Sequence, residues 1–194
     1  MKNYTEEYLK GFTKITNLLV RKDIEKTIKI LVDLKKKKGR VFFLGVGGSA
    51  ANSSHAVNDF RKIANIEAYA PSDNVAELTA RTNDDGWETV FENWLKVSKL
   101  NKKDAVFVLS VGGGNLEKNV SVNIVKALQY AKKVGAKRLG IVSRDGGYTK
   151  KVANSCILVP VVAEDKITPY AEAFQGVLWH LLVFHPKLRD IKAY

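Results

Sequence analysis

The first 38 residues carry apolar side chains at helical spacing in two separate segments. Residues 4 to 19 and 22 to 37 repeat these side chains every three or four positions, as amphipathic helices do. The repeated positions are Tyr8, Leu9, Phe12, Ile15, Leu18 and Leu19, then Ile24, Ile28, Ile30, Leu31 and Leu34. We predict two antiparallel helices that precede the main domain.

After Gly39 the pattern changes to short, continuously apolar runs, which are typical of buried strands. We predict strands at residues 40–45, 66–70, 104–110, 137–143 and 156–160. Helical segments are expected after Ser49, at 88–99, up to about residue 134, after Gly147 and at 170–184. Strands that alternate with helices indicate a parallel sheet covered on both faces. With no linker visible, the sequence predicts a single domain over residues 1–194, divided into a helical pair at 1–38 and an α/β core at 39–194.

Composition narrows the class of protein. A chain of 194 residues that is 45% hydrophobic suits one compact core. Its lone cysteine, Cys156, excludes an intrachain disulfide, and one cysteine with three histidines excludes a Cys-rich structural zinc site. No stretch approaches the roughly 20 apolar residues of a membrane helix, and the N-terminus lacks a signal-peptide core. We therefore expect a soluble, cytoplasmic protein with no membrane partner.

A net charge of +12 indicates an affinity for anions without choosing among them. The densest basic run, residues 35–38, ends a helical pattern just before Gly39, where lysines complement the negative end of a helix. No basic surface interleaved with aromatic residues accompanies it, so we expect no nucleic-acid partner. Phosphorylated metabolites remain as the anions to consider.

Glycine-rich loops follow two predicted strands. Gly45-Val-Gly-Gly-Ser49 leads into a helix, and Gly112-Gly-Gly-Asn115 follows the next clear strand. Their backbone amides can approach an anion closely, although glycine after a strand also serves simple turn geometry. Two such loops at equivalent places in a parallel sheet favour a phosphate site. Neither matches the dinucleotide fingerprint or the P-loop.

Two helices each offer a histidine and a carboxylate. His55 and Asp59 are four residues apart and share a face, and Glu172 and His180 are eight apart and nearly do. Together they could enclose a divalent metal with nitrogen and oxygen ligands. Spacing alone favours a surface His–Asp pair and a separate histidine at the edge of the core. His185, beside Pro186, is most simply a helix-terminal residue.

Residues 83–87, Asn-Asp-Asp-Gly-Trp, have the character of a loop before a helix at 88–99. Asp84 or Asp85 would then cap that helix, or Asp84 would contact a substrate. The sequence leaves both roles open.

Several motifs in this order resemble the phosphoheptose isomerases of the sugar isomerase (SIS) superfamily, over about residues 2–185. They are Gly45 to Ser49, His55 with Asp59, Asn83-Asp84-x-Gly86-aromatic, the Ser110 loop with Asn119-Val120, Asp145-Gly146-Gly147, and the final helix with Glu172 and His180. The resemblance implies a flavodoxin-like three-layer αβα sandwich preceded by a helical hairpin. It also implies a homotetramer whose active sites are completed by neighbouring subunits.

The resemblance further implies conversion of sedoheptulose 7-phosphate to D-glycero-D-manno-heptose 7-phosphate, a step in making heptose for bacterial lipopolysaccharide or capsule. One divalent metal per subunit, zinc by its donors, would be held by His55, Asp59, Glu172 and His180. Asp59 or Glu172 would act as base, and His180 would carry the other proton. The residues expected to bind the sugar phosphate are Gly48, Ser49, Asn83, Asp84, Ser110, Gly113, Gly114, Asn115, Ser143 and Thr168.

This chain differs from that family at several of these positions. It has Asp59 where the family usually has Glu, Glu172 where it has Gln, and Val46 where it has Asn. The family's hydroxyl-rich phosphate loop is here Ser110-Val-Gly-Gly-Gly-Asn115, which leaves more of the binding to backbone amides. Two alternatives follow: an isomerase for a different sugar phosphate, and a non-catalytic SIS-domain binding protein.

Overall fold

The computed structural model describes residues 3–190, so the outermost predicted domain limits, 1 and 194, lie outside it. Five parallel strands form one sheet in the order β2-β1-β3-β4-β5. Their bounds are Val41–Leu44 for β1, Ala68–Tyr69 for β2, Ala105–Leu109 for β3, Lys137–Val142 for β4 and Ser155–Leu158 for β5. The predicted flavodoxin-like parallel sheet is confirmed. Its core strands β1 and β3 are wholly buried, which is why they read as continuous apolar runs.

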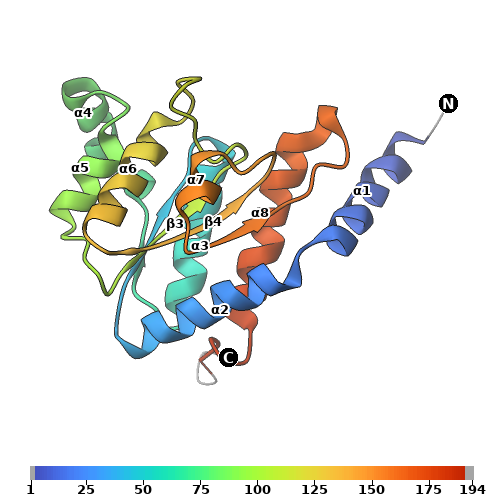
Figure 1. Ribbon diagram of the computed structural model, residues 1–194, viewed down its shortest axis with the longest axis horizontal. Coiled ribbons are helices and arrows are strands. Elements are labelled where there is room, and N and C mark those ends of the chain that lie inside the picture. The colour runs from blue at the N-terminus through green and yellow to red at the C-terminus, as the bar shows by residue number, and fades with distance from the viewer. Residues whose placement is uncertain (1–2, 191–194) are drawn as a thin grey trace.

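Helices cover both faces of this sheet, as Figure 1 shows. One apolar core lies beneath α2 (Arg21–Lys36), α3 (Gly48–Lys62) and α8 (Ile167–Phe184). The other lies beneath α5 (Val90–Val97) and α6 (Val122–Lys133), with α7 (Gly147–Val152) beside them. Short 3-10 turns, η1 (Pro71–Asp73) and η2 (Glu164–Lys166), complete the connections. The predicted three-layer sandwich is therefore confirmed.

The N-terminal segment forms the two predicted helices, α1 (Tyr4–Leu18) and α2, but they do not fold back as an antiparallel pair. In Figure 1 they follow one another from the N-terminus at the right toward the left. Each helix packs elsewhere: Thr27 of α2 hydrogen-bonds Ser155 of β5 at 2.9 Å, and Phe12 of α1 stacks on Phe174 of α8. Contacts with the core therefore replace the contacts that a hairpin would make.

The segment before α5 also differs from the prediction. Residues 83–85 are the last turn of a helix, α4 (Val75–Asp85), and not a loop. Thr89, and neither Asp84 nor Asp85, is the residue that caps α5. The capping prediction for these aspartates is therefore wrong, because they end a helix that begins earlier, at Val75, with Asn74 as its N-cap.

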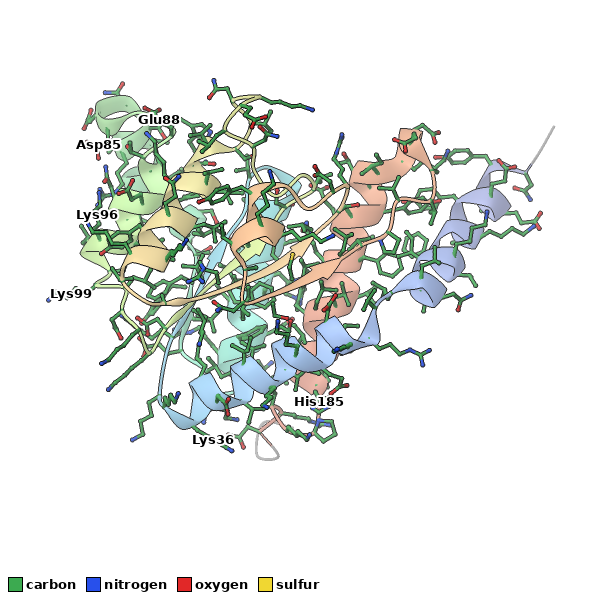
Figure 2. The ribbon with its side chains drawn as sticks, viewed as in Figure 1. Lys36, Asp85, Glu88, Lys96, Lys99 and His185 are labelled. Carbon is green, nitrogen blue, oxygen red and sulfur yellow. The ribbon has the colours of Figure 1, made fainter. Side chains whose placement is uncertain are left out.

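The basic run and the last histidine lie where helix ends were predicted. α2 ends at Lys36, and Lys35 donates from Nζ to the backbone carbonyl of Leu188 at 2.9 Å. His185 caps α8, and Figure 2 shows it near Lys36 at the lower end of the molecule. Among the described residues, no helix is long and apolar enough to cross a membrane.

Candidate metal and substrate site

The site lies along two adjacent helices, α3 and α8, beside the carboxyl end of the sheet. The chain turns from β1 into α3 through Gly47, whose φ of 63° an L side chain rarely adopts. Gly45 must also lack a side chain, because a methyl group there would lie 2.2 Å from the carbonyl oxygen of Ser49. These glycines allow α3 to begin at once and present Ser49 in its first turn.

His55, Asp59 and His180, three of the four predicted metal ligands, lie together in one cluster. Asp59 is 5% exposed, and its Oδ2 lies 3.5 Å from Nε2 of His55 and 3.2 Å from Nε2 of His180. One ligand atom from each residue lies within 4.8 Å of the others. The histidine side chains are 57% and 45% exposed, so the cluster lies on the rim of the molecule.

The backbone of α8 selects the nitrogen that His180 presents. Its Nδ1 lies 2.8 Å from the carbonyl oxygen of Gly176, which can only accept, so Nδ1 carries the hydrogen. In the neutral ring Nε2 then directs a lone pair at the lone pairs of Asp59 Oδ2. A cation between these two atoms, which lie 3.2 Å apart, would stabilise the pair. A carbonyl-anchored imidazole is also the usual arrangement of a metal-ligating histidine.

The donor set fits a divalent metal of the zinc type, since two imidazole nitrogens and a carboxylate are common zinc ligands. Glu172, the fourth predicted ligand, is not part of this cluster. Its carboxylate lies against Gly48 at the start of α3, where a methyl group on Gly48 would come within 2.5 Å of Oε2. The positive end of the helix favours an acidic group at that place.

A hollow of about 450 Å³ lies at the ends of β1, β3 and β4. Five of the predicted phosphate-binding residues line it: Ser49, Ser110, Gly114, Asn115 and Thr168. Two cations that the sequence analysis did not single out, Lys118 and Arg144, line it as well, together with one acidic residue, Asp145. This volume falls in the range of small-molecule sites, and the two cations suit an anionic ligand.

Other predicted residues lie near the hollow but use their polar groups within the fold. Gly113 donates its amide to Ser110 Oγ at 3.0 Å, and its carbonyl accepts from Thr149. The buried Ser143 donates to the carbonyl of Val159 at 2.8 Å. These contacts shape the loops that border the hollow.

Asn83 and Asp84 are not brought to this region within the described chain. Both are exposed in the last turn of α4, where Asn83 donates to Asp84 at 2.7 Å. Figure 2 labels Asp85 of the same turn at the far left of the molecule, across the sheet from α8. A substrate contact by either residue stays a prediction.

Two buried polar side chains of α8 escaped the sequence analysis. Gln175 donates to Ser49 Oγ at 3.0 Å and accepts from Asn52 at 2.8 Å, which joins α8 to α3 beside the hollow. Trp179 donates from its indole to Asp59 Oδ2 at 2.9 Å. Both are buried in a mostly apolar helix, where the polar Gln175 stands out among the buried positions but Trp179 reads as ordinary core.

The hollow and the cluster both border α3. Ser49 and His55 are six residues apart on α3, which at 1.5 Å per residue separates them by about 9 Å along the helix. Phosphate alone cannot cover this span, whereas an extended sugar phosphate can. The cation-lined hollow and the cluster thus lie within the reach of one elongated molecule along α3.

Comparison with known proteins agrees with this geometry. Residues 3–143 match the family model described as SIS domain. A phosphoheptose isomerase of Akkermansia muciniphila is 34% identical over 153 residues, which cover 75% of this chain and 76% of the relative. One from Nitratiruptor is 30% identical over 181 residues, or 91% of this chain and 90% of the relative.

A solved phosphoheptose isomerase from Neisseria gonorrhoeae has the same fold. It superposes with a TM-score of 0.78 at 20% identity and covers 93% of both chains. Family model, relatives and fold agree over most of the chain, and the chain belongs to the SIS domain family, among the phosphoheptose isomerases.

Proposed function

We propose that this protein is a phosphoheptose isomerase, which interconverts sedoheptulose 7-phosphate and D-glycero-D-manno-heptose 7-phosphate in the cytoplasm for bacterial surface polysaccharide. One observation carries the proposal: the cation-lined hollow and the His–Asp–His cluster both border α3, where Ser49 and His55 lie about 9 Å apart along the helix axis. That separation suits a long sugar with a phosphate at one end and a carbonyl at the other.

At the phosphate end, Lys118 and Arg144 supply positive charge, and the hydroxyls of Ser49, Ser110 and Thr168 supply donors. Ser49 is oriented for this task, because its oxygen accepts from Gln175 and its hydroxyl hydrogen remains for the ligand. The amide of Gly114 and the side chain of Asn115 complete the border of this end.

At the other end, His55, Asp59 and His180 would hold one zinc ion per subunit. When bound, zinc would stabilise negative charge that develops on the sugar oxygens. Isomerisation also needs a group that moves a proton between two adjacent carbons. The carboxylates of Asp59 and Glu172 differ in their freedom to move that proton.

Asp59 accepts hydrogen bonds on both oxygens, from Trp179 and from Asn58, and faces two histidines. The carboxylate of Glu172 makes no hydrogen bond or ion pair with the described part of the chain, although its backbone carbonyl accepts from Asn52, and the residue is only half-buried. These contacts support Asp59 as a metal ligand and Glu172 as the base, a role particular to this chain because the family usually has Gln at that position.

The test of the function is turnover of sedoheptulose 7-phosphate with solvent-proton exchange. We expect activity that is lost on exhaustive removal of metal and restored by zinc. We also expect His180→Ala to be inactive. Undiminished turnover of the metal-free protein or of His180→Ala would exclude this mechanism, and turnover of shorter ketose phosphates alone would assign another substrate.

The role of Glu172 is tested by Glu172→Gln, with Glu164→Gln in the exposed 3-10 turn η2 as the matched control. Loss of a general base lowers kcat by about 10²–10⁴-fold. We expect that loss in Glu172→Gln with zinc affinity retained, and no loss in the control. A fully active Glu172→Gln would assign the proton transfer to Asp59.

We further propose a homotetramer in which neighbouring subunits complete the active sites. Support comes from an exposed apolar stripe on α8, formed by Val177, Leu181 and Phe184 beside His180. α1 is mostly exposed too and buries only Gly11 and Ile15. Exposed apolar surface around a half-open site suits coverage by another subunit.

A further inference from the structure

Trp179 is the buried donor closest to the metal cluster. Its side chain is 3% exposed, and its Nε1 donates to Asp59 Oδ2 at 2.9 Å. The same oxygen faces Nε2 of both histidines. The indole therefore contacts the atom on which the whole cluster converges.

The ring of Trp179 also contacts both imidazoles. Its centroid lies 5.3 Å from that of His55 and 5.1 Å from that of His180. On the opposite side of the carboxylate, Asn58 donates to Asp59 Oδ1 at 3.1 Å. With one donor on each oxygen, the carboxylate is held against rotation, and the remaining lone pairs of Oδ2 point toward the histidines.

The indole N–H of Trp179 is chemically suited to hold the carboxylate of Asp59. Its N–H only donates, so Trp179 can neither take the metal nor accept a proton from the substrate. A neutral, rigid donor fixes the carboxylate without adding charge to the cluster. Groups that hydrogen-bond a metal ligand in this way orient it and set its affinity for the ion.

We propose that Trp179 is a positioning residue that orients Asp59 toward the metal. The proposal rests on the proposed function, because it presumes that the cluster holds an ion. It predicts that the indole N–H, and not only the bulk of the ring, contributes to metal affinity.

Trp179→Phe tests this prediction, since it keeps an aromatic ring and removes the N–H. Trp94→Phe is the matched control, because Trp94 packs against Phe42 in the other core and away from the cluster. Zinc affinity is measured by competition with a chromophoric chelator, and folding by circular dichroism and thermal unfolding. We expect about 10–100-fold weaker zinc binding in Trp179→Phe and unchanged binding in the control.

The outcomes separate the two proposals. Wild-type zinc affinity in a folded Trp179→Phe overturns the positioning role and leaves the isomerase standing. A wild-type chain that binds zinc but does not turn over sedoheptulose 7-phosphate overturns the isomerase, while a weakened Trp179→Phe still supports the positioning role. A wild-type chain that binds no zinc overturns both.

A measurement on the unaltered chain covers the case in which Trp179→Phe does not fold. The chain has three tryptophans, so a proton–nitrogen spectrum resolves three indole N–H signals. We expect the Trp179 signal to exchange slowly with solvent and to shift on addition of zinc, while the Trp94 signal stays in place. A Trp179 signal that zinc does not move overturns the proposal.

Discussion

Cys156 shows how burial controls the chemistry of a single side chain. It lies in β5, and desolvation raises the pKa of its thiol to about 12. Because the thiolate is the reactive form, the native thiol should react with a disulfide reagent at pH 8 about a thousandfold more slowly than the same thiol in urea. Rapid native labelling, followed by absorbance, would contradict this expectation.

At the candidate site, sequence spacing predicted the residues that share a helix, the family resemblance joined His180 of α8 to them, and the other contacts between helices were missed. The four-residue interval placed His55 and Asp59 together correctly, since that interval fixes a shared face. The bond from Trp179 to Asp59 joins residues 120 positions apart, which no local pattern encodes. The same holds for Lys118 and Arg144, which only the packing of separate loops brings to one hollow.

The polar contact between α3 and α8 depends on the side chain of Gln175. Gln175→Ala removes the group that bridges Ser49 and Asn52, and leaves buried polar atoms unpaired at a cost of about 1–3 kcal/mol. We expect a lower free energy of unfolding in urea and a raised KM, since Ser49 loses its orientation. The chain's other glutamine, the exposed Gln129 on α6, provides the control. Equal stability of the two variants would refute this role.

The elements with apolar patterns were predictable, and those without were not. All five strands and most helices follow from buried runs or helical stripes. α4 buries no residue: Asn74 caps it, accepting from the amide of Glu77, and Glu77 pairs with Arg81 at 2.8 Å. Such a helix has no apolar stripe, so its residues read as a loop. The predicted hairpin failed for a related reason, because periodicity gives a helix its apolar face but not the surface that this face will cover.

At the scale of the molecule, the exposed faces of α1 and α8 predict assembly. Leu9 is 59% exposed on α1, and Leu9→Glu would place an unpaired carboxylate in the proposed interface. We expect light scattering to show a tetramer for the wild type and a smaller species for this variant. Val97→Glu, at a position 67% exposed on α5, should keep the wild-type mass. A wild type that is a single chain at all concentrations would refute the assembly.

The open rim that carries His55 and His180 also determines how long an ion would reside there. With both imidazoles reached by solvent in one chain, a chelator meets no barrier from the fold, so a lone subunit would exchange its metal quickly. A neighbouring subunit over the rim would make metal release as slow as dissociation of the subunits. Dilution, more than heat or time, would then be the treatment that empties the site.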